Sequence, residues 1–129
     1  MAEPAEPALP AALLLAIEQF NGGEYFQCHE TLEALWHGED GPVASLYQGM
    51  IQIAAGLHQA KNGNRRGALA LLERGMGNLR MHASPSQGVD VEGLMAQADR
   101  WHELVVAAGD RLPGLPWTQA PMIRRAGTP

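Results

Sequence analysis

Hydrophobic residues recur every three or four positions along most of the chain, and Gly, Asn and Pro separate the stretches that carry this period. A period near 3.6 is typical of amphipathic helices, whereas strands need alternating β-branched and aromatic residues, and no such run occurs here. The pattern predicts five helices, at about residues 9–21, 24–36, 43–62, 65–81 and 90–108. Short connections make neighbouring helices antiparallel. We therefore predict an all-α fold, a compact bundle of about five helices built from antiparallel helical hairpins.

The third predicted helix is apolar over most of its circumference, so we expect it to lie at the centre of the bundle. Gly49 and Gly56 on this helix leave room for neighbouring helices to approach. The fourth predicted helix contains Gly67, Gly75 and Gly77, and each costs about 1 kcal/mol relative to Ala. Close contact between helices would explain why these glycines are present.

The two ends of the chain differ from its middle. Residues 1–8 consist mainly of Ala, Pro and Glu, with little to bury, and we expect them to be disordered. Residues 9–108 form the predicted helical bundle domain. Residues 109–129 contain too many prolines for regular structure, which predicts an extended tail packed on the bundle. Trp117 lies between prolines in that tail and should pin it to the bundle, the alternative being a contact with a partner.

Length and charge narrow the classes of function. A chain of 129 residues is one domain by size, and its net charge of −5 argues against nucleic acid as the main partner, because phosphate binding needs a basic face. The apolar run at residues 9–18 is too short to span a membrane, and the acidic segment before it is unlike a secretory signal. We therefore expect a cytoplasmic protein with neither nucleic acid nor membrane as a partner.

The charges are unevenly placed along the chain. Residues 1–40 contain acidic side chains and no Lys or Arg, while residues 61–80 are rich in Lys and Arg and contain only Glu73 as an acid. These two regions should face each other, either within one bundle or across a dimer, and we expect the protein to form a homo-oligomer.

The second predicted helix holds the one local arrangement that suggests chemistry. His29 and Glu33 are one helical turn apart on an apolar arc that also contains Phe26, Cys28 and Trp36. Burying an ionised carboxylate without a partner costs several kcal/mol, so Glu33 must be paired, protonated or open to a cleft. Cys28 is the only cysteine, which excludes an intrachain disulfide, and we expect a buried thiol rather than a nucleophile.

Polar residues on the neighbouring helices extend this arrangement into a cluster. The predicted cluster comprises His29, Glu30, Glu33, Trp36, Gln48, Gln52, His58 and Arg66. In the structural interpretation, Glu33 or Glu30 pairs with Arg66, His29 bonds Glu33, and the glutamines satisfy nearby backbone or water. A satisfied buried network of this kind fixes the register of helices without any reaction.

A metal site is the second interpretation. His29 and Glu33 at positions i and i+4 can both reach one divalent ion, with His58 of the third predicted helix as a third ligand. Glu30 would then be the candidate base for a bound water. The segment is not an HExxH motif, because Glu33 stands where the second histidine would be, and zinc, manganese and iron stay open.

A third interpretation uses the same residues without a metal. Glu33 would act as a general base and His29 as the acid or as the group that orients it. The sequence offers no nucleophilic Ser or Cys and no Gly-rich phosphate loop to complete such a site. The cofactor therefore stays undefined, and no catalytic residue is assigned beyond the candidate Glu30.

Three blocks of sequence resemble the domain of unknown function 309 family. The matching residues are Asn21, Tyr25, Phe26, His29, Glu30, Leu32, Glu33 and Trp36, then Gln48, Gly49, Ile51, Gln52 and His58, then Gly63, Asn64, Arg66, Gly67 and Ala68. The turn after Gly22 is one residue longer than the family pattern. The resemblance spans about residues 12–108 and implies a small helical bundle, without an assigned activity. We therefore expect a binding or interaction module, the alternative being a metal-binding protein or metal-dependent hydrolase.

Overall fold

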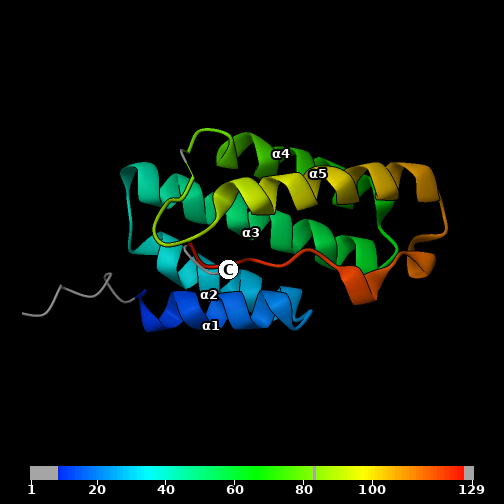
Figure 1. The fold of residues 1–129 in the computed structure, drawn as a ribbon. Coiled ribbons are helices and arrows are strands. Elements are labelled where there is room, and N and C mark those ends of the chain that lie inside the picture. Colours follow the sequence, from blue (N-terminus) through cyan, green and yellow to red (C-terminus); the bar gives the residue numbers. More distant parts are fainter. Residues whose placement is uncertain (1–8, 83, 127–129) are drawn as a thin grey trace, which may run out of the picture.

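Five α-helices and two short 3-10 helices make up the described part of the chain (Figure 1). The computed structural model describes residues 9–82 and 84–126, so the predicted disorder of residues 1–8 lies outside the described part. The elements are α1 (Ala11–Asn21), α2 (Tyr25–His37), α3 (Gly41–Lys61), α4 (Arg65–Leu79), α5 (Val91–Ala108), η1 (Leu112–Gly114) and η2 (Trp117–Gln119). Each helix lies within a few residues of its predicted position. The prediction of an all-α bundle with an extended C-terminal tail is confirmed over the described residues.

The same turn closes the first and second helical hairpins. Gly23 and Gly63 both have φ +79°, a left-handed conformation that glycine adopts without strain. The backbone N–H of Glu24 donates to Gln19 O at 2.8 Å, and that of Asn64 donates to Gln59 O at 2.8 Å. These bonds satisfy the last carbonyl groups of α1 and α3 and turn the chain directly into the next helix.

Side-chain caps begin α4 and α5. The Asn64 side chain accepts a hydrogen bond from the Gly67 N–H at 2.9 Å, and the Asp90 side chain accepts one from the Gly93 N–H at 3.0 Å. A short polar side chain in this position satisfies a free N–H of the first helical turn.

Helix α3 is central, and glycines let α4 pack closely against it. A Cβ atom added at Gly49 would lie 2.9 Å from Leu79 Cδ2, and one at Gly75 would lie 2.7 Å from Ile53 Cδ1. Real Cβ atoms do not approach so closely, so a side chain at either position would force Leu79 or Ile53 to move. Gly77 is different, because a Cβ there would meet nothing within 4 Å. The expectation of close helix contact is therefore right for Gly75 and wrong for Gly77.

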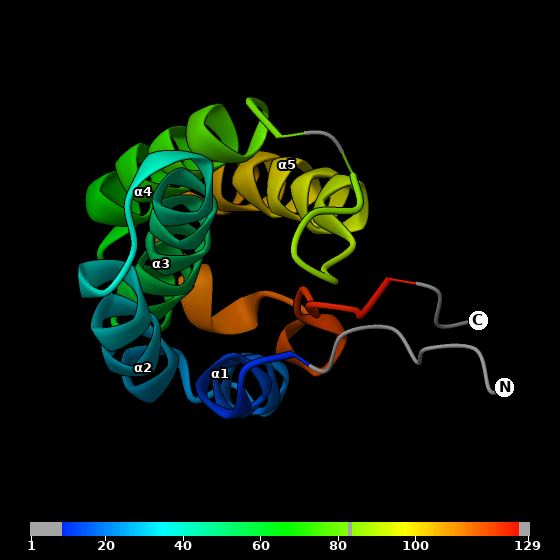
Figure 2. The ribbon, with the colours of Figure 1, turned by 90° about the vertical axis from the view of Figure 1, so that its left-hand side faces the viewer.

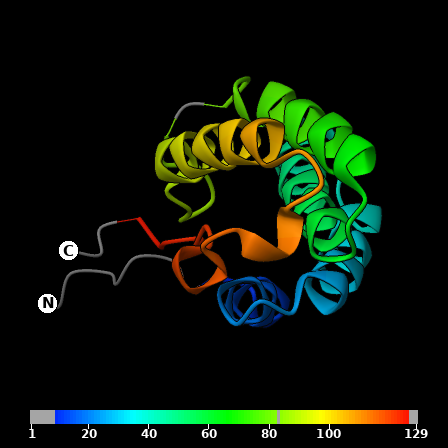
Figure 3. The same ribbon diagram turned by 90° about the vertical axis from the view of Figure 1, so that its right-hand side faces the viewer.

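The helices pack in chain order, and together they curl around the C-terminal tail. Helix α1 packs on α2, α2 on α3, α3 on α4 and α4 on α5. Seen from either end, the curl leaves α1 and α5 facing each other across the tail (Figures 2 and 3). None of the described helices is long and apolar enough to cross a membrane.

Buried residues hold the tail in this position. Leu112 and Ile123 are each 1% exposed. The Trp117 ring lies 4.8 Å from Trp101 and 6.5 Å from Tyr25 between centroids, and its indole N–H donates to Leu112 O at 3.2 Å. Trp117 therefore contacts the bundle, as its pinning role requires.

Candidate functional site

His29 and Glu33 lie at the edge of the packed face of α2, where solvent reaches them, rather than inside the bundle. We call this edge the rim of α2. The side chains are 29% and 43% exposed, and Nε2 of His29 lies 3.5 Å from Oε1 of Glu33. Helix α2 packs instead through Tyr25, Cys28 and Leu32, which are all buried. The burial that the apolar arc suggested for Glu33 is therefore wrong, whereas the predicted contact between His29 and Glu33 is present. The apolar arc of α2 is wider than the surface that its neighbours cover.

The predicted pairing with Arg66 is also absent. Arg66 takes part neither in the ion pair of His29 with Glu33 nor in that of His102 with Glu73. Both Arg66 and Glu30 are exposed. A carboxylate at the rim is solvated and needs no buried cation, which removes the reason for the pairing.

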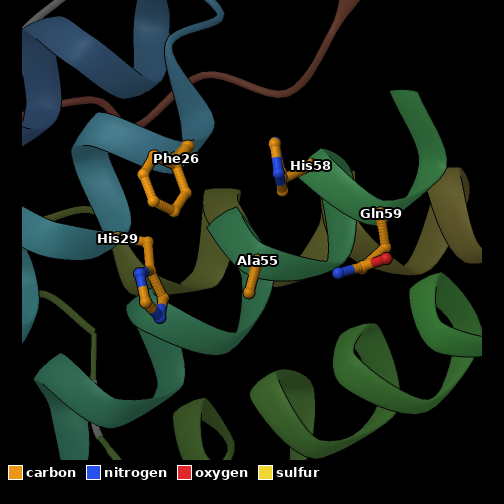
Figure 4. Close-up of a pocket in the computed structure, with 5 residues that line it drawn as sticks. All are labelled: Phe26, His29, Ala55, His58 and Gln59. Carbon is orange, nitrogen blue, oxygen red and sulfur yellow. The ribbon is translucent and has the colours of Figure 1, made fainter. Parts of the chain in front are cut away.

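His58 contributes to a small pocket beside His29. The pocket has a volume of about 210 Å³ and is lined by Phe26, His29, Ala55, His58 and Gln59 (Figure 4). The Phe26 ring is 48% exposed and lies 5.5 Å from the His58 ring and 6.2 Å from the His29 ring between centroids. An aromatic side chain therefore lies near both imidazoles, and Nε2 of His58 contacts Asn62 Nδ2 at 3.1 Å.

The predicted metal ligands do not gather. In the described part of the chain, no three His, Cys, Asp or Glu side chains lie close enough to hold a metal ion. His29 and Glu33 contact each other, while the contacts of His58 are to Asn62 and Phe26. The predicted metal site of His29, Glu33 and His58 is therefore wrong. His29 and Glu33 contact each other, and His58 does not join them as a third ligand.

The other predicted cluster members have separate surroundings. Gln52 accepts a hydrogen bond from Asn78 Nδ2 at 2.6 Å, which joins α3 to α4. Gln48 is half-buried on α3. Trp36 is half-buried and packs against the core. The Nδ1 atom of His29 is buried and has no hydrogen-bond partner among the described residues.

Cys28 and Tyr25 form the buried side of α2. Burial raises the pKa of the Cys28 thiol to about 12, although a backbone hydrogen bond at Phe20 acts in the opposite direction. Burial, and then the nearby Cys28, raises the pKa of Tyr25 to about 12. A thiol with this pKa stays protonated and unreactive at neutral pH, as predicted for a buried cysteine.

A second polar site lies where the tail crosses between α1 and α5. The Asn21 side chain donates from Nδ2 to Ile123 O at 3.0 Å, and its Oδ1 accepts from the Ile123 N–H at 2.7 Å. The Gln97 side chain donates from Nε2 to Met122 O at 2.9 Å, and its Oε1 accepts from the Met122 N–H at 2.8 Å. Two amides on opposite helices thus bind two successive backbone units of the tail.

The loop before α5 binds the next part of the tail. The Asp90 N–H donates to Arg124 O at 2.9 Å, and the Ala126 N–H donates to Gly88 O at 2.8 Å. We call the four residues Asn21, Gly88, Asp90 and Gln97 the tail seat. These residues meet the main chain of the tail, so their contacts do not depend on the side chains that the tail carries.

Three successive side chains of the tail, at residues 121–123, alternate between the core and solvent. Pro121 is buried and Ile123 is 1% exposed, whereas Met122 between them is 42% exposed. This alternation is the period of an extended chain. Residues 121–123 in the tail seat therefore show the side-chain alternation of an extended segment.

The tail seat was not predicted from the sequence. Asn21 was noted only as a helix end and a family match, and Gln97 was not singled out. Each amide lies at the margin of an apolar helix face, beside Phe20 in α1 and beside Ala98 in α5. A polar residue at such a margin is a weak signal, because its partner is 102 residues away for Asn21.

Comparison with known proteins identifies part of the chain. Residues 13–71 match the model of the family described as Domain of unknown function (DUF309). A search of curated protein sequences finds no match to the chain. The matched segment contains Asn21 and the His29–Glu33 pair, whereas Gln97 and the tail lie after it. Residues 13–71 therefore belong to the domain of unknown function 309 family, an uncharacterised family, as the sequence motifs indicated.

Proposed function

We propose that the protein is a polypeptide-binding module that holds an extended segment between α1 and α5. Its own tail is the occupant in the present conformation, and a segment of a partner protein competes for the same place. The single observation that carries this proposal is the double amide contact, in which Asn21 and Gln97 bind the backbone of Ile123 and Met122.

Main-chain recognition supports a binding role for these amides. Each amide side chain offers one donor and one acceptor to a peptide unit, so an extended segment of any sequence can satisfy it. Each such hydrogen bond contributes about 1 kcal/mol net. Proteins that bind extended peptides combine such main-chain bonds with pockets for alternate side chains.

The seated tail defines the chemistry of a partner segment. Buried Pro121 and Ile123 require apolar residues two positions apart, and exposed Met122 leaves the position between them free. The N–H groups of Met122 and Ile123 both donate, so neither of these two positions can be proline. We therefore propose that the partner segment contains three successive residues of a defined kind. The first is apolar, the second is any residue except proline, and the third is apolar and not proline.

Competition with the attached tail sets the expected affinity. A covalently linked segment acts at an effective concentration of about 1 mM, so it displaces weak external ligands. A partner segment must therefore bind tightly, or the tail must first be released. A variant whose tail cannot seat should bind the same segment much more strongly than the native chain does.

The test is a titration with a labelled peptide that carries residues 117–126. The full chain with Ile123→Asp should release its tail and bind the peptide at least about tenfold more tightly than the native chain, because the effective concentration of the competing tail is removed. Met122→Asp is the matched control, since this exposed position should keep the tail seated and the affinity low. A peptide with an N-methyl group at the Ile123 position should bind weakly, because it lacks one N–H donor. A folded Ile123→Asp chain that does not bind the peptide would contradict the proposal.

A further inference from the structure

We infer that two copies of this chain exchange their tails, so that residues 112–126 of each copy fill the tail seat of the other. This inference rests on the proposed function, because it requires the tail to be a removable ligand. The partner is thus a second copy of the chain, and the interface is the seat already described. It gives a specific geometry to the homo-oligomer that the sequence led us to expect.

The identity of the occupant follows from the fit of the tail itself. A second copy carries Leu112, Pro121 and Ile123, which the native tail buries. It also offers the same N–H and C=O groups to Asn21 and Gln97. The exchanged pair therefore repeats every contact of the closed chain, and only the chain connection differs.

The position of the seat makes the exchange mechanically simple. The helices pack in order from α1 to α5, so α1 and α5 are the two ends of the array. The tail bonds to both ends, through Asn21 and Gln97. A tail from a second copy would contact the same two helices, α1 and α5. When each copy places its tail in the seat of the other, both seats are filled and the result is a symmetric dimer.

Gly109 determines which copy receives the tail. This residue ends α5 with φ +58° and ψ −115°, a conformation that residues with a side chain rarely adopt. A Cβ at Gly109 would meet nothing within 4 Å, so the backbone conformation, rather than space, requires glycine here. Asp110 and Arg111 beside it are exposed. A residue that prefers helical angles at this point would extend α5 and direct the tail away from its own seat.

Concentration sets the balance between the closed and exchanged forms. Because the contacts are equal, the closed chain is favoured by the effective concentration of its own tail, about 1 mM for a short connection. The native chain should therefore be monomeric at micromolar concentration and form the exchanged pair as its concentration approaches about 1 mM. If the residues directly after α5, the hinge, cannot direct the tail onto its own seat, the preference for the closed chain is lost. Such a chain should form the exchanged dimer at a much lower concentration.

The test changes the hinge in the full chain and measures the molar mass by light scattering. The variant Gly109→Ala with Asp110→Ala should double in mass at concentrations where the native chain is a monomer. Gly114→Ala is the matched control, because Gly114 has an ordinary φ and nothing within 4 Å of an added Cβ, and it should stay monomeric. Adding Asn21→Ala and Gln97→Ala to the hinge variant should restore the monomer, as should an excess of the peptide with residues 117–126.

Three outcomes would overturn the inference. The hinge variant could remain a monomer, or its dimer could persist after both amides are removed. If the hinge variant does not fold, sedimentation of the native chain at about 1 mM decides, and a monomer there also contradicts exchange. A dimer of the native chain at about 1 mM that the Ile123→Asp substitution abolishes would support the exchange of tails. Peptide binding by the Ile123→Asp chain together with failed exchange would refute this inference alone, whereas loss of peptide binding would refute the proposed function too.

Discussion

The His29 cluster and the tail seat are both polar groups on apolar helices, but they differ in what their polar atoms contact. In the cluster, His29 and Glu33 bind each other on one helix, and the side chains are partly solvated. In the seat, Asn21 and Gln97 lie on helices at opposite ends of the array and bind a segment from a third part of the chain. The His29–Glu33 contact therefore lies within one helix, while the seat joins the two ends of the array.

This difference shows that conspicuous residue types are a poor guide to where a fold uses polar contacts. Histidine and glutamate one turn apart suggest chemistry in any helix, yet the rim of α2 lets solvent reach both side chains. Asparagine and glutamine are ordinary surface residues, but here each matches the donor and acceptor of a peptide unit.

The largest contrast should appear when one apolar side chain is removed from each region. Ile123→Ala should lower the free energy of unfolding by about 3 kcal/mol, because Ile123 is 1% exposed and its removal leaves a cavity. Phe26→Ala should change it by less than about 1 kcal/mol, because Phe26 is 48% exposed and its removal leaves no closed cavity. Urea unfolding followed by circular dichroism measures both values. Equal losses would remove the distinction between the two regions.

A smaller contrast concerns the polar groups themselves. Asn21→Ala should cost about 2 kcal/mol, since it leaves the partly buried N–H and C=O of Ile123 without partners. Gln97→Ala should cost about 1 kcal/mol or less, because water can replace it at the exposed Met122 backbone. His58→Ala on the cluster side is the control, with an expected change below about 0.5 kcal/mol. A loss at His58 as large as that at Asn21 would contradict this account.

The buried side of α2 can be separated from its rim by pH. Burial holds the pKa of both Cys28 and Tyr25 at about 12 in the folded chain, above their values in an unfolded chain of about 8.5 and 10. The unfolded chain therefore loses these protons first, and stability falls as the pH rises from about 9 towards 12, by at most about 1.4 kcal/mol per pH unit for each group. Urea midpoints at several pH values measure this fall. Cys28→Ala should reduce the slope between about pH 9 and pH 10, and an unchanged slope there would show that the thiol is not protected.

The smallest effect is expected for Glu33 and Arg66. Because Glu33 is 43% exposed and Arg66 forms no ion pair with it, Glu33→Ala should change stability by less than about 0.5 kcal/mol. The double variant with Arg66→Ala should be additive within experimental error. A coupling energy above about 1 kcal/mol would restore the buried pair that the sequence suggested.

Local sequence patterns predicted the fold well because its determinants are local. The glycine turns at Gly23 and Gly63 and the caps at Asn64 and Asp90 involve residues within a few positions of one another. The apolar period identified α3 as the central helix for the same reason.

The sites were harder to predict, for two physical reasons. A helical projection shows that Glu33 lies near an apolar arc, but only packing decides how much of the arc is covered, and α2 is covered at Leu32 and not at Glu33. Asn21 meets Ile123 across 102 residues, and main-chain contacts leave no requirement on the side chains involved. Only the curl of the helices brings those two segments together (Figure 2).

The most direct test of the account compares two full-length chains in one peptide titration. If the tail is a ligand held by its main chain, the Ile123→Asp chain should bind the peptide with residues 117–126 at least about tenfold more tightly than the Met122→Asp chain. Equal affinities for the two folded chains, or the absence of binding to either, would contradict the claim that α1 and α5 form a peptide-binding site.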